Sequence, residues 1–139
     1  MHRRLAYLLA CLAVVVSATG CSSSPQNPSG PSETPMITDP FVGSVNPNGA
    51  QTNFFLVLAA GDITATITAL SGDGTVVGLE LGTSADGINC QHVISNDSAR
   101  QGSTMVGRAS GGPAAFCARL YDTGSLTETV TYTLEVVHP

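Results

Sequence analysis

DITATITAL, residues 62–70, alternates apolar and hydroxyl side chains from Ile63 to Ala69. Successive side chains of an extended chain point to opposite faces, so the apolar residues at the odd positions share one face and three threonines share the other. Residues 129–138, TVTYTLEVVH, repeat the pattern, with Val130, Tyr132, Leu134 and Val136 on one face. Both stretches predict half-buried β-strands with a threonine-rich outer face.

Turn-forming residues separate these two strands from five others. Residues 71–74 (SGDG), 85–87 (ADG) and 111–113 (GGP) are typical of turns and chain breaks. The other predicted strands are residues 52–59, 75–81, 89–95, 103–109 and 114–122. About seven short strands with turns between them favour an all-β fold, an antiparallel β-sandwich that we expect to occupy residues 39–139 as one domain.

Residues 1–20 have the three parts of a secretory signal peptide. Arg3 and Arg4 supply the positive charge, residues 5–16 form an apolar run, and residues 17–20 (SATG) are small. The apolar run is too short to remain as a transmembrane helix, which needs roughly 20 residues. We therefore expect the mature protein to be exported without a membrane-spanning helix of its own.

Cys21 follows the signal at once and is the predicted site of lipidation. Residues 18–21 (ATGC) resemble a bacterial lipobox, in which the cysteine receives diacylglycerol before cleavage. Cys11 also follows a lipobox-like sequence, but it would leave an apolar run of about six residues, shorter than a signal peptide needs. Two or more acyl chains on Cys21 would hold the protein stably on a membrane in the cell envelope. The alternative is a secreted protein without a lipid.

Residues 22–38 (SSSPQNPSGPSETPMIT) predict a disordered tether. They show no apolar periodicity and cannot bury enough surface to offset the entropy of ordering. Their prolines favour extended backbone, so the segment could reach roughly 50 Å at about 3.1 Å per residue. A lipid at Cys21, this spacer and a globular domain together predict display outside the cytoplasm.

The charge balance excludes one class of partner. The chain has five arginines, no lysine and ten acidic residues, for a formal net charge of −5. Removal of the signal peptide takes away Arg3 and Arg4 and makes the mature protein more acidic. Without a basic patch to neutralise phosphates, nucleic-acid binding is not expected. The predicted partners are the membrane, through the lipid anchor, and a cell-surface protein or glycan.

Cys90 and Cys117 are the two cysteines of the predicted β-domain. Export delivers them to a compartment in which disulfides form and persist, so we predict that they are bonded to each other. The alternative is a metal site with two thiolate ligands, for which His92 is the nearby additional ligand.

Several short stretches resemble the bacterial pre-peptidase C-terminal domain family over about residues 43–137. They are residues 60–67 (AGDITATI), 78–81 (GLEL), 116–122 (FCARLYD) and 132–136 (YTLEV). Phe116 stands where the family commonly has tyrosine, and the preceding glycine is displaced to Gly111 and Gly112. The resemblance implies a jelly-roll-like β-sandwich that accompanies exported enzymes without being catalytic. It also implies that calcium or a polymeric substrate is a possible ligand.

The residues give little support for catalysis. His2 leaves with the signal peptide, His138 is expected to be mobile, and His92 lies on the same predicted strand as Cys90. The sequence contains no GxSxG or HExxH motif. We therefore do not expect an enzyme, and no cofactor is predicted apart from calcium.

Calcium prefers carboxylate and backbone carbonyl oxygens. Asp73 and Asp86, each followed by glycine, are the candidate ligands. The alternative is that both aspartates only shape their turns.

A glycan site usually needs exposed aromatic residues. The chain has no tryptophan, and its aromatic residues mostly occupy strand positions that predict burial. Tyr121, out of phase with Phe116 and Leu120, is the predicted exposed aromatic residue. The sequence thus predicts a non-catalytic, surface-tethered module with a structural or adhesive role. The alternatives are a calcium- or polysaccharide-binding module and an accessory subunit of a secreted hydrolase.

Overall fold

A computed structural model describes residues 34–139, so the predicted signal peptide, Cys21 and most of the predicted tether lie outside the described residues. Eight β-strands follow one another along this range: β1 (Ile37–Val45), β2 (Ala50–Val57), β3 (Gly61–Leu70), β4 (Val77–Ser84), β5 (Gln91–Ala99), β6 (Thr104–Ala109), β7 (Ala114–Tyr121) and β8 (Val130–His138). The range contains no helix, and hence none that could cross a bilayer.

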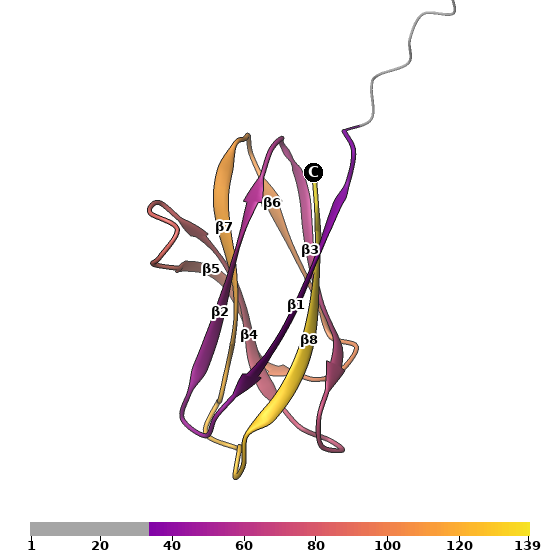
Figure 1. The fold of residues 1–139 in the computed structure, drawn as a ribbon, viewed down its shortest axis with the longest axis vertical. Coiled ribbons are helices and arrows are strands. Elements are labelled where there is room, and N and C mark those ends of the chain that lie inside the picture. The colour runs from indigo at the N-terminus through magenta and orange to yellow at the C-terminus, as the bar shows by residue number, and fades with distance from the viewer. Residues whose placement is uncertain (1–33) are drawn as a thin grey trace, which may run out of the picture. The chain divides into compact units, whose positions relative to one another are not determined.

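The strands form two four-stranded antiparallel sheets that pack face to face (Figure 1). One sheet has the order β1-β8-β3-β6 and the other has the order β2-β7-β4-β5. Two interleaved sheets with this strand order make an eight-stranded jelly roll. The predicted all-β antiparallel sandwich is confirmed.

The sequence analysis missed one strand and placed the start of the domain too late. The missed strand is β1, which begins at Ile37 inside the predicted tether and pairs with β8 from Ile37↔His138 to Val45↔Val130. Its sequence, ITDPFVGSV, contains Pro40, which argues against a central strand. At the edge of a sheet a proline is tolerated, because one side of the strand needs no hydrogen-bond donors.

The core lies between the sheets and is built from the alternating residues of each strand. Val130, Tyr132, Leu134 and Val136 of β8 are all buried, as predicted. One residue of β3 departs from the prediction: the ladder between β3 and β8 shifts register between Ile67 and Ala69. The shift leaves Ala69 exposed and turns Leu70 into the core in its place.

The predicted disulfide is confirmed. Cys90 and Cys117 are bonded, with their Cα atoms 5.8 Å apart, and they join the start of β5 to β7. Gly82 of β4 permits this arrangement, because a Cβ atom there would lie 2.2 Å from the carbonyl oxygen of Gln91. A structural disulfide of this kind is typical of proteins that fold outside the cytoplasm.

His138 is not mobile, contrary to the prediction. Its ring is only 1% exposed, lies with its centroid 5.2 Å from that of Phe55, and places Nε2 3.0 Å from Oδ2 of Asp39. The pairing of β8 with β1 brings Asp39 beside the end of the chain, which the sequence of β8 alone does not reveal.

Candidate functional site

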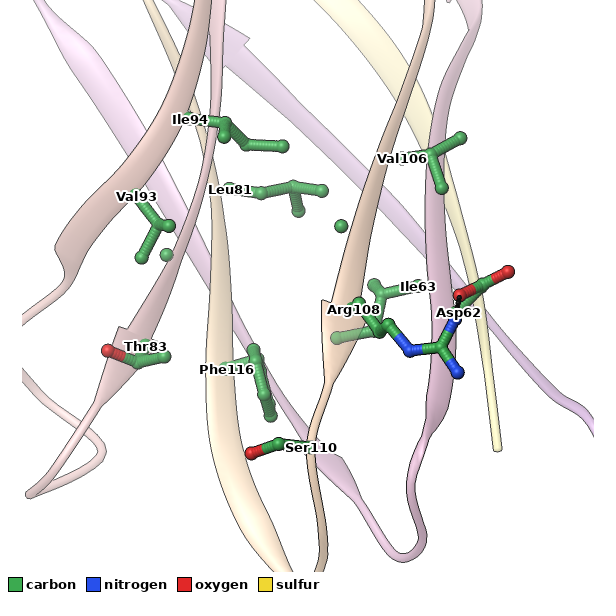
Figure 2. Close-up of a pocket in the computed structure, with 12 residues that line it drawn as sticks. Asp62, Ile63, Leu81, Thr83, Val93, Ile94, Val106, Arg108, Ser110 and Phe116 are labelled. Carbon is green, nitrogen blue, oxygen red and sulfur yellow. Dashed lines mark hydrogen bonds and ion pairs between the residues drawn. The ribbon is translucent and has the colours of Figure 1, made fainter.

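The two sheets separate at the edge where β5 and β6 end the sandwich, leaving an apolar cleft of about 480 Å³. We call it the edge cleft. Ile63, Leu81, Ile94 and Phe116 form its apolar walls, as Figure 2 shows. The remaining lining residues are Asp62, Gly82, Thr83, Val93, Val106, Gly107, Arg108 and Ser110. A cleft of this size and character suits an apolar group of a ligand.

Gly107 keeps the cleft open from the side of β6. It pairs with the buried Ile63 of β3, so a side chain at this position would point between the sheets. A Cβ atom on Gly107 would lie 3.4 Å from Cδ1 of Leu81 and 4.0 Å from Cδ1 of Ile94. The missing side chain therefore leaves the space that the cleft occupies.

A β-bulge shapes the opposite wall. Leu81 pairs with Ile94 and Gly82 pairs with His92, so Val93 is an extra residue without a partner on β4. A bulge of this kind breaks the alternation of side chains between the two faces of a strand. Val93 and Ile94 consequently both line the cleft, although they are consecutive (Figure 2).

The polar groups of the cleft lie mainly at its rim. Arg108 donates from Nη1 to Oδ1 of Asp62 at 3.2 Å, and both side chains are largely exposed. Thr83 and Ser110 contribute hydroxyl groups. The lining residues include no histidine or cysteine that could act as a base or nucleophile beside them. Asp62, paired with Arg108, is the one carboxylate of the lining.

Residues 85–90 join β4 to β5 and project from the sandwich as a hairpin (Figure 1). We call them the hairpin arm. Its tip carries Ile88, whose side chain is 77% exposed. The disulfide at Cys90 fixes one end of the arm to β7. The arm thus presents a large aliphatic side chain to solvent.

Asp86 organises the arm from within. Its Oδ1 accepts hydrogen bonds from the backbone N–H of Asn89 at 2.8 Å and of Ile88 at 2.9 Å. The side chains of Asn89 and Ser84 also donate to its carboxylate. These donors, the backbone N–H of Asn89 first, hold the pKa of Asp86 well below its usual range. The carboxylate is thus charged and already engaged by the arm itself.

The two predicted calcium ligands are not brought together. Asp86 belongs to the hairpin arm, whereas Asp73 belongs to the turn between β3 and β4. Within the described range, no three His, Cys, Asp or Glu side chains are grouped closely enough to hold a metal ion. The geometry around Asp86 fits the alternative in which this aspartate shapes its turn.

Tyr121 lies half-buried on the outer face of the β2-β7-β4-β5 sheet. Its ring lies against Gly78, where a Cβ atom would overlap it, and its hydroxyl donates to Asp97 of β5. Burial, and next the hydrogen bond to Asp97, raise the pKa of Tyr121 to about 12. Nearby, Nη1 of Arg119 lies 3.0 Å from Oε2 of Glu80, and its guanidinium carbon is 5.3 Å from the centre of the Tyr121 ring.

The two histidines of the described range do not form a catalytic pair with any cleft residue. His92 is exposed on β5, and His138 is bonded to Asp39 at the opposite edge of the sandwich. Neither ring lines the edge cleft.

The sequence analysis missed the edge cleft. Two signals were present: a glycine within the predicted strand 103–109, and two adjacent β-branched residues, Val93 and Ile94, where strict alternation would place one. Neither signal identifies a cleft unless it is also known that β5 and β6 belong to different sheets.

No known protein family matches the sequence, and no curated protein matches it either. Solved structures that share the fold include the following two. A mitogen from Yersinia pseudotuberculosis is 13% identical, with a TM-score of 0.55 over 74% of this chain and 86% of that one. PliG from Aeromonas hydrophila, a periplasmic inhibitor of g-type lysozyme, is 15% identical, with a TM-score of 0.50 over 71% of this chain and 83% of that one. At these identities the likeness shows the fold alone.

Proposed function

We propose that this protein is an exported, surface-tethered β-sandwich module without catalytic activity, and that its role is adhesive: it holds another macromolecule at the cell envelope. The observation that carries the proposal is the edge cleft, an apolar opening whose neighbouring aliphatic side chains remain exposed. Val93 on one side of the cleft is 68% exposed, Val106 on the other side is 58% exposed, and Ile88 on the hairpin arm is 77% exposed. An apolar cleft with exposed aliphatic side chains on both sides suits a site of interaction.

The evidence for membrane tethering comes from the amino-acid sequence. The signal-like residues 1–20, Cys21 and the proline-rich spacer support a lipid-anchored protein, and the disulfide supports a domain that folds outside the cytoplasm. A Cys21→Ser variant should lose incorporation of labelled palmitate and leave the membrane fraction. If the wild-type protein incorporated no label and stayed soluble, a secreted module would replace the tethered one.

The proposed absence of catalysis rests on the chemistry of the edge cleft. Its walls are apolar, its lining contains no histidine or cysteine, and its one carboxylate, that of Asp62, is paired with Arg108. Fold neighbours described as a mitogen and as a periplasmic lysozyme inhibitor are compatible with a role in binding. The resemblance to pre-peptidase C-terminal domains supports the same role and keeps an accessory subunit of a secreted hydrolase as an alternative.

The test compares two exposed valines on the exported chain. Val93 lines the cleft, whereas Val42, 79% exposed on β1, lies at the other edge of the sandwich. Immobilised wild-type protein should retain a component of envelope preparations from the producing cells, and Val93→Ser should reduce this retention while Val42→Ser leaves it unchanged. Equal retention by all three proteins would count against the cleft as the adhesive site.

A polysaccharide or calcium ligand is the second candidate. Tyr121, Arg119 and Asp97 present an aromatic ring, a guanidinium group and a carboxylate on one sheet face, which are groups that bind sugars. Thermal unfolding with cell-wall glycans or with calcium tests this alternative, because a ligand that binds the native state raises the unfolding midpoint. A shift with a glycan that is lost in Tyr121→Ala would favour the sheet face over the edge cleft.

A further inference from the structure

We infer that the edge cleft binds a basic peptide segment of another protein, which places one aliphatic or aromatic side chain between the sheets. The inference rests on the proposed adhesive function and names the chemistry of the partner. It draws on three features of the described residues: the apolar interior of the cleft, the acidic character of its surroundings, and the exposed hairpin arm.

The interior of the cleft selects an apolar group. Ile63, Leu81, Ile94 and Phe116 surround the space that Gly107 leaves open. A sugar would leave its hydroxyl groups without hydrogen-bond partners against these walls, which is costly when water is excluded. An aliphatic or aromatic side chain would instead gain free energy in proportion to the apolar surface that it buries.

The acidic residues around the cleft favour a positively charged partner. The arm carries Asp86, β5 carries Asp97 on the outer face of its sheet, and neither segment has a lysine or arginine. At the rim, Asp62 balances Arg108, the one cation of the lining. Across residues 34–139, nine acidic residues outnumber three arginines. An anionic membrane or a nucleic acid would be repelled, whereas lysines or arginines beside the inserted side chain would be attracted.

The hairpin arm offers a second apolar contact to a partner longer than a free small molecule. Ile88 at its tip is exposed and lies outside the cleft, on the loop that continues the strands of one cleft wall. A ligand confined to the cleft would leave this side chain in water. A peptide segment that enters the cleft and continues along the arm would cover it as well.

The mode of binding is side-chain insertion rather than addition of a strand to β5. The ladder between β4 and β5 shifts register twice, between Val77 and Leu79 and between Leu81 and Gly82. Bulges of this kind bend an edge strand and interrupt the regular row of backbone groups that an added strand needs. Val93, the extra residue of the second bulge, instead widens the apolar wall.

The experiment selects random phage-displayed peptides on the exported chain carrying Cys21→Ser, so that no lipid interferes. Selected peptides are then synthesised, and their affinities are measured by fluorescence anisotropy at low and high sodium chloride. Three matched variants accompany the parent: Val93→Ser and Gly107→Leu alter the cleft, and Val42→Ser alters the other edge. Sedimentation of the parent alone shows whether it associates with a second copy of itself.

We expect the selected peptides to combine lysine or arginine with leucine, isoleucine or an aromatic residue. Their affinity should fall about fivefold with Val93→Ser, since a buried apolar contact is lost. Gly107→Leu should abolish binding, Val42→Ser should leave it unchanged, and added salt should weaken it. Peptides without basic residues, equal affinity for all variants, or tighter binding at high salt would overturn the inference.

The experiments distinguish a failure of this inference from a failure of the proposed function. If no peptide is selected but retention of an envelope component depends on Val93, the adhesive role stands and the inference of a basic peptide partner is wrong. If the Cys21→Ser chain forms a dimer that Gly107→Leu disrupts, a second copy of this chain occupies the edge cleft. The inference of a basic peptide partner is then also wrong. If peptide selection and retention both fail, the proposed function falls together with the inference.

Discussion

Val93 and Ile94 are consecutive residues of β5, yet both side chains line the same cleft. In a regular strand one of them would point to the other face of the sheet. The bulge at Val93 therefore converts an edge strand into a wall of the binding surface, while the disulfide at Cys90 holds the beginning of that strand against β7.

Filling the cleft should remove binding without unfolding the protein. In Gly107→Leu the new side chain enters open space beside Leu81 and Ile94, and Gly107 does not have a positive φ that would strain a larger residue. We expect loss of partner retention with a thermal midpoint equal to or above that of the wild type, because the added side chain buries apolar surface. Thermal unfolding measured beside the retention assay checks this. Retention at the wild-type level by a folded Gly107→Leu protein would show that the partner binds elsewhere.

The disulfide should contribute a large part of the stability. Cys90 and Cys117 are 27 residues apart, and closing a loop of this length stabilises by roughly 3–4 kcal/mol in the chain-entropy model. The double variant Cys90→Ser/Cys117→Ser should lose about this much free energy of unfolding in urea denaturation. The wild type unfolded under reducing conditions is the control and should behave like the variant. A loss below about 1 kcal/mol would mean that packing holds the hairpin arm without the covalent link.

Most of the strands could be predicted from the sequence, because alternation and turn residues are patterns within short segments of the chain. Alternation identified the strands around Ile63 and Leu134, and glycine-rich turns separated their neighbours. The strand around Phe41 was missed, since Pro40 and nearby polar residues resemble the tether more than a strand. The disulfide was predicted because export and a single pair of cysteines leave few alternatives.

The edge cleft and the position of His138 depend on contacts between distant parts of the chain. Gly107 opens the cleft only because β6 ends one sheet while β5 ends the other. His138 is buried against Phe55 of β2, and the pairing of β1 with β8 places Asp39 3.0 Å from the imidazole. Neither pairing has a signature within a single strand, so the sequence alone did not predict the candidate site.

Asp122 should make the protein sensitive to acid. Its carboxylate accepts hydrogen bonds from the backbone N–H groups of Asn48 at 2.8 Å and of Gly124, Ser125 and Leu126 at 2.8–3.0 Å. These bonds, that from Asn48 first, lower the pKa of Asp122. The stabilisation is therefore complete above the ordinary aspartate pKa of about 3.9 and is lost as the pH falls through the lower pKa of the folded state.

The Asp122→Asn variant tests this dependence. We expect a lower thermal midpoint than the wild type at neutral pH and a smaller decline of the midpoint on acidification. Asp73→Asn, in an exposed turn, is the matched control and should follow the wild type. Parallel curves for Asp122→Asn and the wild type across the acid range would refute the role of the carboxylate.

After burial, which is the larger cause, Asp97 should contribute to the raised pKa of Tyr121. Replacement by asparagine removes a negative charge and a hydrogen-bond acceptor that favour the protonated phenol, so the pKa of Tyr121 should fall from about 12 towards its ordinary value. Spectrophotometric titration of the phenolate measures the change, and Tyr121→Phe identifies which signal belongs to this residue. Because the folded-state pKa is raised, the associated stability is present below the ordinary tyrosine pKa and is lost as the pH rises through the folded-state value. An unchanged titration in Asp97→Asn would contradict the hydrogen bond.

Binding of the partner in the edge cleft can be tested with a photo-crosslinking amino acid placed at position 93 or at position 42 of the full chain and activated in the producing cells. We expect a discrete heavier product from position 93, none from position 42, and loss of the product when Gly107→Leu is added. Equal products from both positions, or a product from position 93 that persists with Gly107→Leu, would contradict it.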